Sequence, residues 1–375
     1  MMKLRGLGNI VARLTAARRV LDEANAHNHG HSLIEMKGFG SNPGKLRART
    51  FIPAGLRSGA PLVVVLHGCT QNAGVYDIGS GWSQLAQREG FALLFPEQQR
   101  TNNSNLCFNW YSPDDARRDR GEAKSISQMV KHMTAQHELD QARVYVTGLS
   151  AGGAMTSVML ATYPELFAGG AVIAGLPFAT ANSLPEALGR MRGHGGPTRR
   201  ELAAQVRGAA RHSGPMPSLS VWHGTQDTIV HPSNASAMID QWRDIHGLGA
   251  SPGIAEIVGQ HRREVWRDPD GREIIERYDI RGMGHGTPLA TRGSEVCGTV
   301  GPHMLDADIC STRMIAAFWG LADADSESRE PKREMVERIA VRDTESATSR
   351  PHAGHRTGEV GAIIEDALRA AGLMR

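Results

Sequence analysis

The chain has 375 residues and a formal net charge of only +3, which leaves room for one large α/β domain or two smaller domains. Its arginines are scattered instead of forming a basic stripe with interleaved aromatic residues, so the sequence gives no sign of a nucleic-acid-binding surface. No apolar run approaches the roughly 20 residues that a membrane-spanning helix needs. We therefore expect a globular protein with neither a nucleic-acid partner nor a membrane span.

The two ends of the sequence differ in composition from the middle. Residues 1–33 are basic and loosely amphipathic, and arginines interrupt the apolar stretch that a secretory signal peptide requires. This pattern favours a surface helix or arm over a cleaved leader. Residues 323–375 are charged and Ser-rich, with a short amphipathic segment near the end. We expect a single main domain over residues 34–322, followed by a charged, flexible tail with a short terminal helix.

The main domain alternates apolar runs with amphipathic segments. Continuous apolar runs predict buried strands at 62–66, 91–96, 144–147, 168–175 and 219–222. Amphipathic spacing predicts helices at 82–89, 122–139 and 311–321, and alternation around turn residues predicts hairpins at 34–52 and 265–280. Strands that alternate with helices imply right-handed crossovers. The predicted fold is therefore a mostly parallel, doubly wound α/β sheet.

Residues 176–217 interrupt this rhythm because they are rich in Gly, Pro and Arg. Loops this long are uncommon inside a compact domain unless they serve a function. Two interpretations remain open: a cap over a functional site, or a helical excursion packed on the surface.

One stretch has the pattern of a nucleophile elbow. A β-branched strand leads into Gly148-Leu149-Ser150-Ala151-Gly152, and small residues and methionines follow with helical character. Glycines on both sides of Ser150 allow a sharp turn that carries the serine at its apex. The following helix directs its positive N-terminus at the position where an oxyanion would form. The sequence therefore predicts Ser150 as a nucleophile, against the alternative of a connecting loop.

A serine nucleophile needs a base and an acid that orients the base, and in this fold the chain order is Ser, then Asp or Glu, then His. Asp227 follows the predicted strand at 219–222, and His285 follows the last predicted strand with a glycine on each side. We therefore predict Asp227 as the acid and His285 as the base. The competing candidates are His223, His231, Asp279 and His303.

The tetrahedral oxyanion requires two backbone N–H groups, one after the nucleophile and one from the loop after an earlier strand. Ala151 is predicted to supply the first and Cys69 the second, with His67 bracing the loop. The four cysteines allow three pairings, and we favour Cys69 with Cys107 and Cys297 with Cys310. The cysteine and histidine spacings match no metal-site motif, and the predicted chemistry needs no cofactor.

The combined motifs resemble those of the polyhydroxybutyrate (PHB) depolymerase family of esterases, to which feruloyl and acetylxylan esterases are related. The resemblance spans residues 34–321 and rests on several segments. These are Leu66-His67-Gly68-Cys69-Thr70-Gln71, Cys107-Phe108-Asn109-Trp110, Gly121-Glu122 with Ser125-Ile126, Gly148–Met155, Trp222-His223-Gly224 with Asp227 and Val230, and Met283-Gly284-His285-Gly286.

The resemblance implies an α/β-hydrolase that cleaves carboxylic esters, and it supports Ser150, Asp227 and His285 as the triad and Cys69 with Ala151 as the oxyanion hole. Family members are commonly secreted, whereas this sequence has no clear leader and no domain for binding crystalline polymer. Extracellular and cytoplasmic locations therefore both stay open, and soluble oligomers or small esters are the expected substrates.

The substrate pocket is less well defined by the sequence, and its candidates are His67, Trp110, Tyr111 and Trp222, with a core role equally open for Trp222. The alternatives to a PHB depolymerase-like esterase are a feruloyl or acetylxylan esterase, a peptidase or acyltransferase on the same framework, and a catalytically inactive binding protein. The sequence does not indicate the oligomeric state.

Overall fold

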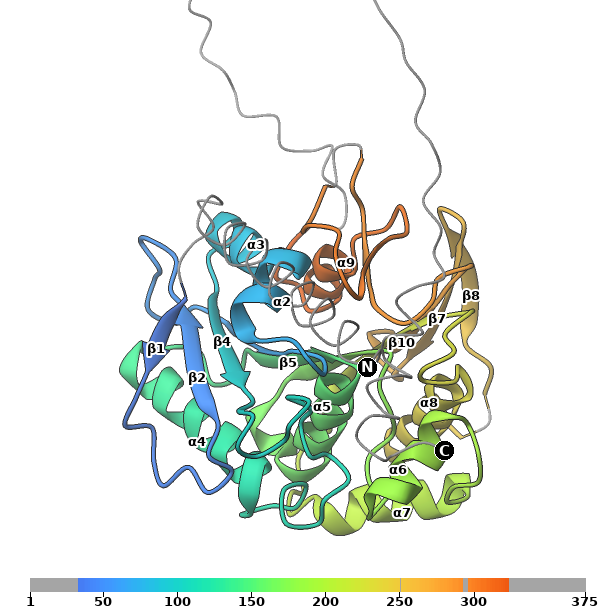
Figure 1. Ribbon diagram of the computed structural model, residues 1–375. Coiled ribbons are helices and arrows are strands. Elements are labelled where there is room, and N and C mark those ends of the chain that lie inside the picture. The colour runs from blue at the N-terminus through green and yellow to red at the C-terminus, as the bar shows by residue number, and fades with distance from the viewer. Residues whose placement is uncertain (1–32, 250, 293–295, 324–375) are drawn as a thin grey trace, which may run out of the picture. The chain divides into compact units, whose positions relative to one another are not determined.

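Figure 1 shows the computed structural model, which describes residues 33–249, 251–292 and 296–323. The arm predicted for residues 1–33, apart from its last residue, and the tail beyond residue 323 lie outside the described residues. The domain boundaries predicted there therefore remain predictions.

The described residues form a 10-stranded sheet in the order β1-β2-β4-β3-β5-β6-β7-β10-β9-β8. The strands from β4 to β10 in this order are parallel, and antiparallel strands flank them on both sides. Their bounds are β1 Ile34–Met36, β2 Arg47–Phe51, β3 Leu62–Leu66, β4 Ala92–Glu97, β5 Val144–Leu149, β6 Gly169–Ile173, β7 Ser218–Gly224, β8 Ile254–Val258, β9 His261–Arg267 and β10 Glu273–Ile280. The predicted parallel, doubly wound sheet is confirmed.

Helices cover both faces of this sheet (Figure 1). One face carries α2 (Ala73–Ser80), α3 (Trp82–Glu89) and α9 (Ser311–Phe318); the other carries α4 (Gly121–Gln136), α5 (Ala151–Thr162), α7 (Arg199–Ala209) and α8 (Ser233–Ile245). Side chains of β3 alternate between the two cores, with Val63 and Val65 in one and Leu62, Val64 and Leu66 in the other. A strand buried on both faces must be apolar throughout, which explains the continuous apolar run.

Most elements that the sequence analysis did not predict have weak apolar patterns, although the unpredicted helix α8 buries Met238, Ile239 and Trp242. Helix α2 contains two glycines and is delimited by Asn72, whose side chain accepts a hydrogen bond from Val75 N–H, and by Gly81 in the left-handed conformation. Strand β8 is an edge strand with a mostly exposed surface. A separate parallel pair, β11 (Thr287–Leu289) and β12 (Met304–Asp306), has only three residues in each strand.

Residues 176–217 contain two helices with different surroundings. Helix α7 buries Leu202, Ala203 and Val206 and packs beside α5 and α8, as the predicted helical excursion would. Helix α6 (Leu184–Met191) lies beside the loop that follows β7, because Met191 O accepts a hydrogen bond from His231 N–H at 2.7 Å. A capping role for α6 therefore stays a prediction. No helix within the described residues is long and apolar enough to cross a membrane.

The packing of α3 and α9 on the sheet can be tested at Trp82. Its buried indole stacks on Trp319 (ring centroids 6.1 Å apart) and meets the edge of Phe91 (6.3 Å). We expect Trp82→Ala to lower the free energy of unfolding by about 3–5 kcal/mol because it leaves a large cavity. Urea denaturation would measure this loss, with Gln84→Ala on the exposed side of α3 as the control. A loss below about 1 kcal/mol would contradict this packing.

Candidate active site

Ser150 lies at a sharp turn between β5 and α5. Its backbone has φ +56° and ψ −115°, an unfavourable conformation for a residue other than glycine, and Ser150 N–H donates to Ile173 O at 2.9 Å. A Cβ atom at position 148 would lie 2.5 Å from Gly152 O, and one at position 152 would lie 2.4 Å from Leu66 O. Both contacts are with backbone atoms, so the turn requires glycine on each side of Ser150.

This turn places the N-terminus of α5 directly after Ser150. Ala151 is the first residue of the helix, and its N–H has no hydrogen-bond partner among the described residues. Unpaired N–H groups at a helix N-terminus attract negative charge. Ala151 N–H is therefore available to a developing anion.

Asp227 and His285 form the central hydrogen bond of the site. The Asp227 Oδ2 atom lies 2.7 Å from His285 Nδ1, and Asp227 Oδ1 accepts from Ile229 N–H (2.9 Å) and Val230 N–H (2.8 Å). Burial alone would raise the pKa of Asp227, but hydrogen bonds from His223 and His285 outweigh it and hold that pKa far below its ordinary value. The carboxylate is ionised and accepts a hydrogen bond from Nδ1–H of His285, so His285 Nε2 is left as the basic nitrogen.

The sheet topology explains why these two residues meet. Strands β7 and β10 are parallel neighbours, with Gly224 opposite Ile280, so the loops after them leave from the same edge. The loops are in close backbone contact: Gln226 N–H donates to Met283 O at 3.0 Å, and a Cβ at position 224 would lie 2.3 Å from Met283 O. Gly224 is therefore required for the approach of the two loops.

The competing candidates have other partners. His223 is buried and donates from Nε2 to Val230 O at 2.7 Å, and the same nitrogen lies 3.4 Å from Asp227 Oδ2. His231 bonds to Ser233, and Asp279 forms salt bridges with Arg262 and Arg277. His303 donates from Nδ1 to His285 O at 3.1 Å. It therefore contacts the main chain of His285 and leaves the Asp227 carboxylate to other donors.

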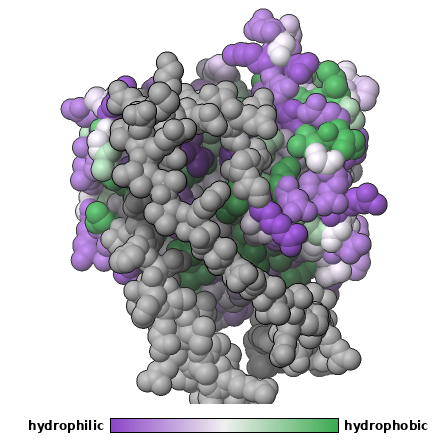
Figure 2. Space-filling model, turned by 90° about the horizontal axis from the view of Figure 1, so that it is seen from above, coloured by the Kyte–Doolittle hydropathy of each residue, from purple (hydrophilic) through white to green (hydrophobic). Residues whose placement is uncertain are grey.

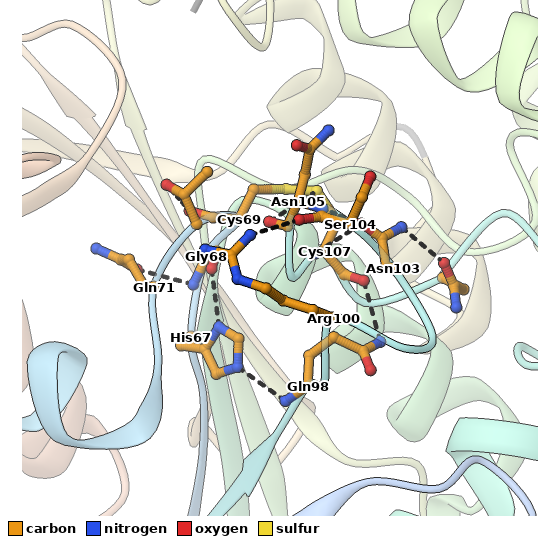
Figure 3. Close-up of a disulfide and its surroundings, with 12 residues drawn as sticks. His67, Gly68, Cys69, Gln71, Gln98, Arg100, Asn103, Ser104, Asn105 and Cys107 are labelled. Carbon is orange, nitrogen blue, oxygen red and sulfur yellow. Dashed lines mark hydrogen bonds between the residues drawn. A yellow bond between two sulfur atoms is a disulfide. The ribbon is translucent and has the colours of Figure 1, made fainter. Parts of the chain in front are cut away.

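Hydrogen bonds of His67 and a disulfide at Cys69 hold the loop after β3 (Figure 3). The buried His67 accepts from Gln98 N–H at Nε2 (3.1 Å), so its proton is on Nδ1, which donates to Gly68 O at 2.8 Å. Gly68 O belongs to the same peptide group as Cys69 N–H, so this bond orients that N–H. Burial lowers the pKa of His67, which keeps the ring neutral. His67 is occupied by the loop and has no surface for a substrate.

The structure also joins this loop to the next one covalently. Cys69 is bonded to Cys107, and Cys297 is bonded to Cys310 near the His285 loop. These are the two pairings that the sequence analysis favoured. Cys69 N–H has no hydrogen-bond partner among the described residues.

A buried carboxyl group that the sequence analysis gave no role supports the Cys107 loop. Glu122, at the start of α4, accepts hydrogen bonds from Gln98 Nε2 (2.5 Å), Asn109 N–H (2.8 Å) and Asn109 Nδ2 (2.8 Å). Gln98 Nε2 also donates to Cys107 O at 3.0 Å. Gln98 follows β4 without any recognisable motif, so only the folded chain reveals that it connects Glu122 to His67.

The remaining pocket candidates differ in their surroundings. Trp222 is fully buried, its indole stacks on Tyr278 at 3.8 Å between ring centroids, and its Nε1 donates to Ser220 Oγ at 2.8 Å. It is therefore a core residue and has no surface to offer a substrate. Trp110 is mostly buried and Tyr111 is partly exposed, with their rings edge to face at 5.5 Å. These two remain candidates for the pocket.

No group of three or more His, Cys, Asp or Glu side chains in the described part of the chain is arranged to hold a metal ion.

The sheet order and the strand–turn–helix elbow define the protein as an α/β-hydrolase. Residues 46–267 match the family model described as "Esterase PHB depolymerase". Over 293 residues the chain is 44% identical to poly(3-hydroxyalkanoate) depolymerase C of Paucimonas lemoignei, which covers 78% of this chain and 70% of that protein. The chain therefore belongs to the esterase PHB depolymerase family and is a carboxylic ester hydrolase.

Relatives with lower sequence identity are named for other substrates. Feruloyl esterase B of Talaromyces stipitatus is 34% identical over 270 residues, or 68% of this chain and 73% of that protein. Among solved structures, the acetyl xylan esterase from Aspergillus awamori matches with a TM-score of 0.66 and 24% identity, covering 78% of this chain and all of that one. This structural match supports the α/β-hydrolase fold.

The titration of Glu122 tests the buried network. Burial raises its pKa from 4.5 to about 8. Between pH 4.5 and pH 8 the folded protein keeps the proton on Glu122, whereas the unfolded chain releases it. The stabilisation that this proton gives to the folded state is therefore lost as the pH rises through this range. We expect the free energy of unfolding of the wild type, relative to the non-titrating Glu122→Gln, to fall by a few kcal/mol from pH 4.5 to pH 8.

Urea titrations across this pH range would measure the difference. Glu138→Gln replaces an exposed carboxylate beyond the other end of α4 and provides the matched control. A difference between wild type and Glu122→Gln that is constant with pH would contradict the assigned environment of Glu122.

Proposed function

We propose that this esterase works through an acyl-enzyme, with Ser150 as nucleophile, His285 as general base and Asp227 as the acid that orients it. The observation that carries the proposal is the 2.7 Å hydrogen bond between Asp227 Oδ2 and His285 Nδ1. Because this bond places the ring proton on Nδ1, His285 Nε2 is left to take the proton of Ser150 Oγ. The serine oxygen then attacks the ester carbonyl.

The tetrahedral intermediate places negative charge on the former carbonyl oxygen. We assign its stabilisation to Ala151 N–H and Cys69 N–H, which lack protein partners within the described residues. The imidazolium of His285 then donates its proton to the departing alcohol. Water, deprotonated by the same histidine, attacks the acyl-enzyme; the bond from the acyl carbon to Ser150 Oγ then breaks, His285 returns the proton to Ser150 Oγ, and the acid is released. The ionised Asp227 stabilises the imidazolium in both halves of the reaction.

The substrate proposed is a soluble hydroxyalkanoate oligomer or small ester. Its support is the 44% identity with a protein named poly(3-hydroxyalkanoate) depolymerase. Binding to an insoluble polyester surface would need a contiguous apolar patch. Six large hydrophobic residues in the described part of the chain are exposed: Ile34 on β1, Leu184 on α6, Ile254 and Ile257 on β8, and Val296 and Val300 in the loop before β12.

The distribution of these residues favours soluble substrates. Ile34 is on β1 and Ile254 is on β8, at opposite edges of the sheet. The described surface visible in Figure 2 is mainly hydrophilic, with hydrophobic side chains in small groups. Feruloyl or acetylxylan ester hydrolysis is the second candidate, favoured by the 34% identity with a feruloyl esterase.

The triad assignment predicts large losses of activity from single substitutions. We expect Ser150→Ala and His285→Ala each to lower kcat/KM for p-nitrophenyl butyrate by about 10⁴- to 10⁶-fold, because the three residues act as a unit. Asp227→Asn should cost about 10⁴-fold by allowing the wrong tautomer. Ser58→Ala, at an exposed serine, is the control.

A fluorophosphonate probe should label wild type and Ser58→Ala but not Ser150→Ala. Wild-type protein that neither reacts with the probe nor releases p-nitrophenol would support the inactive binding protein instead. Activity of His285→Ala close to that of wild type would overturn the choice of base.

Substrate profiling tests the second part of the proposal. We expect kcat/KM to be highest for 3-hydroxybutyrate dimers and trimers, lower for methyl ferulate and acetylated xylan, and negligible for p-nitroanilide amides. Product acids would be quantified by chromatography. A preference of tenfold or more for the feruloyl or acetylxylan substrate would favour the second candidate, and amide cleavage at a comparable rate would indicate a peptidase.

A further inference from the structure

The turn at Pro302–His303 brings a histidine against the His285 loop. Met304 N–H donates to Gly301 O at 2.9 Å, and His303 has φ +61°. Proline in the second position followed by a residue with positive φ is the pattern of a type II turn, where glycine or asparagine is usual. A positive φ is uncommon for a residue other than glycine, and histidine is one of the few residue types enriched there.

The His303 side chain contacts His285 in two ways. His285 O can only accept, so the 3.1 Å contact means that His303 Nδ1 donates. The two rings are also edge to face, with centroids 5.6 Å apart at 79°. One contact fixes the main chain of His285 and the other restricts its side chain.

The main chain of the turn adds further contacts with the same loop. Thr287 N–H donates to His303 O at 2.8 Å, and a Cβ at position 286 would lie 2.7 Å from that oxygen. The glycine after His285 is thus required for the approach of the turn. The Cys297–Cys310 disulfide spans the segment that carries it.

The turn also contacts the loop after β3. Gln71 Nε2 donates to Pro302 O at 3.5 Å, while Gln71 Oε1 accepts from Gly68 N–H at 2.9 Å. Two adjacent residues therefore connect the loop of the proposed base with the loop of the proposed oxyanion donor.

We propose that His303 is a positioning residue for His285: its Nδ1–H holds the His285 carbonyl and its ring supports the His285 ring. This inference rests on the proposed function, since it takes His285 as the base. His303 moves no proton in the reaction. It limits the displacement of His285 relative to Ser150, and small displacements of a reacting group are costly for the rate.

Substitutions that place a donor either near the position of Nδ1 or further out test the role of His303. His303→Ala removes both contacts, and we expect kcat for p-nitrophenyl butyrate to fall about 10- to 100-fold with KM changed less than about twofold. His303→Asn keeps a donor near the position of Nδ1 and tolerates positive φ, so it should restore kcat to within about threefold of wild type. His303→Gln moves the donor one bond further out and should not restore it.

Asp308→Ala is the matched control, because Asp308 is exposed, lies on the same segment and also has positive φ (+55°). We expect it to retain wild-type kcat. Unchanged kcat in His303→Ala, a loss confined to KM, or rescue by Gln instead of Asn would overturn the inference. If His303→Ala does not fold, the comparison of Asn with Gln decides alone.

The parallel His285→Ala variant separates this inference from the proposed function. If His285→Ala is inactive while His303→Ala is fully active, only the positioning role fails. If His285→Ala is active, the assignment of the base fails first.

Discussion

The close approach of helix α5 to the end of β3 is the contact on which the rest of the site depends. Leu66 and Gly148 are paired in adjacent parallel strands, and a Cβ at position 152 would lie 2.4 Å from Leu66 O. Only glycine allows the helix to start this close to the strand end. The same approach places Ser150 and the unpaired Ala151 N–H beside the loop that follows β3. A larger residue would separate the nucleophile from this loop.

The loop after β3 illustrates how buried polar groups specify a single geometry. His67, Gln98 and Glu122 are buried, and each has hydrogen-bond partners with defined donor and acceptor roles. Because unpaired buried polar groups are costly, alternative arrangements of this loop are disfavoured. The result is a peptide group between Gly68 and Cys69 whose carbonyl is held by His67, and whose N–H has no partner in the part of the chain that the structure describes.

Much of this organisation could be predicted from the sequence, for reasons that also set its limits. Strands buried on both faces are continuous apolar runs, so β3 was predicted at its observed bounds, while the exposed edge strand β8 has no such pattern. Asp227 and His285 were predicted from their order in the chain and from their positions after predicted strands, and the parallel pairing of β7 with β10 brings their loops together. Trp222 was considered for the pocket, since a sequence does not show that Tyr278 on the neighbouring strand covers its ring.

The two halves of the site are stabilised differently. Ser150 and Asp227 follow strands in the middle of the sheet, where flanking strands and helices fix the backbone on both sides. His285 follows β10 and is succeeded by short strands and turns, from which Met283, Leu289 and Met304 reach the core. Backbone hydrogen bonds, a disulfide and close glycine contacts add to this packing in residues 283–292 and 296–310. A histidine on such a loop depends on its neighbours for alignment, and the left-handed turn at His303 supplies one directly.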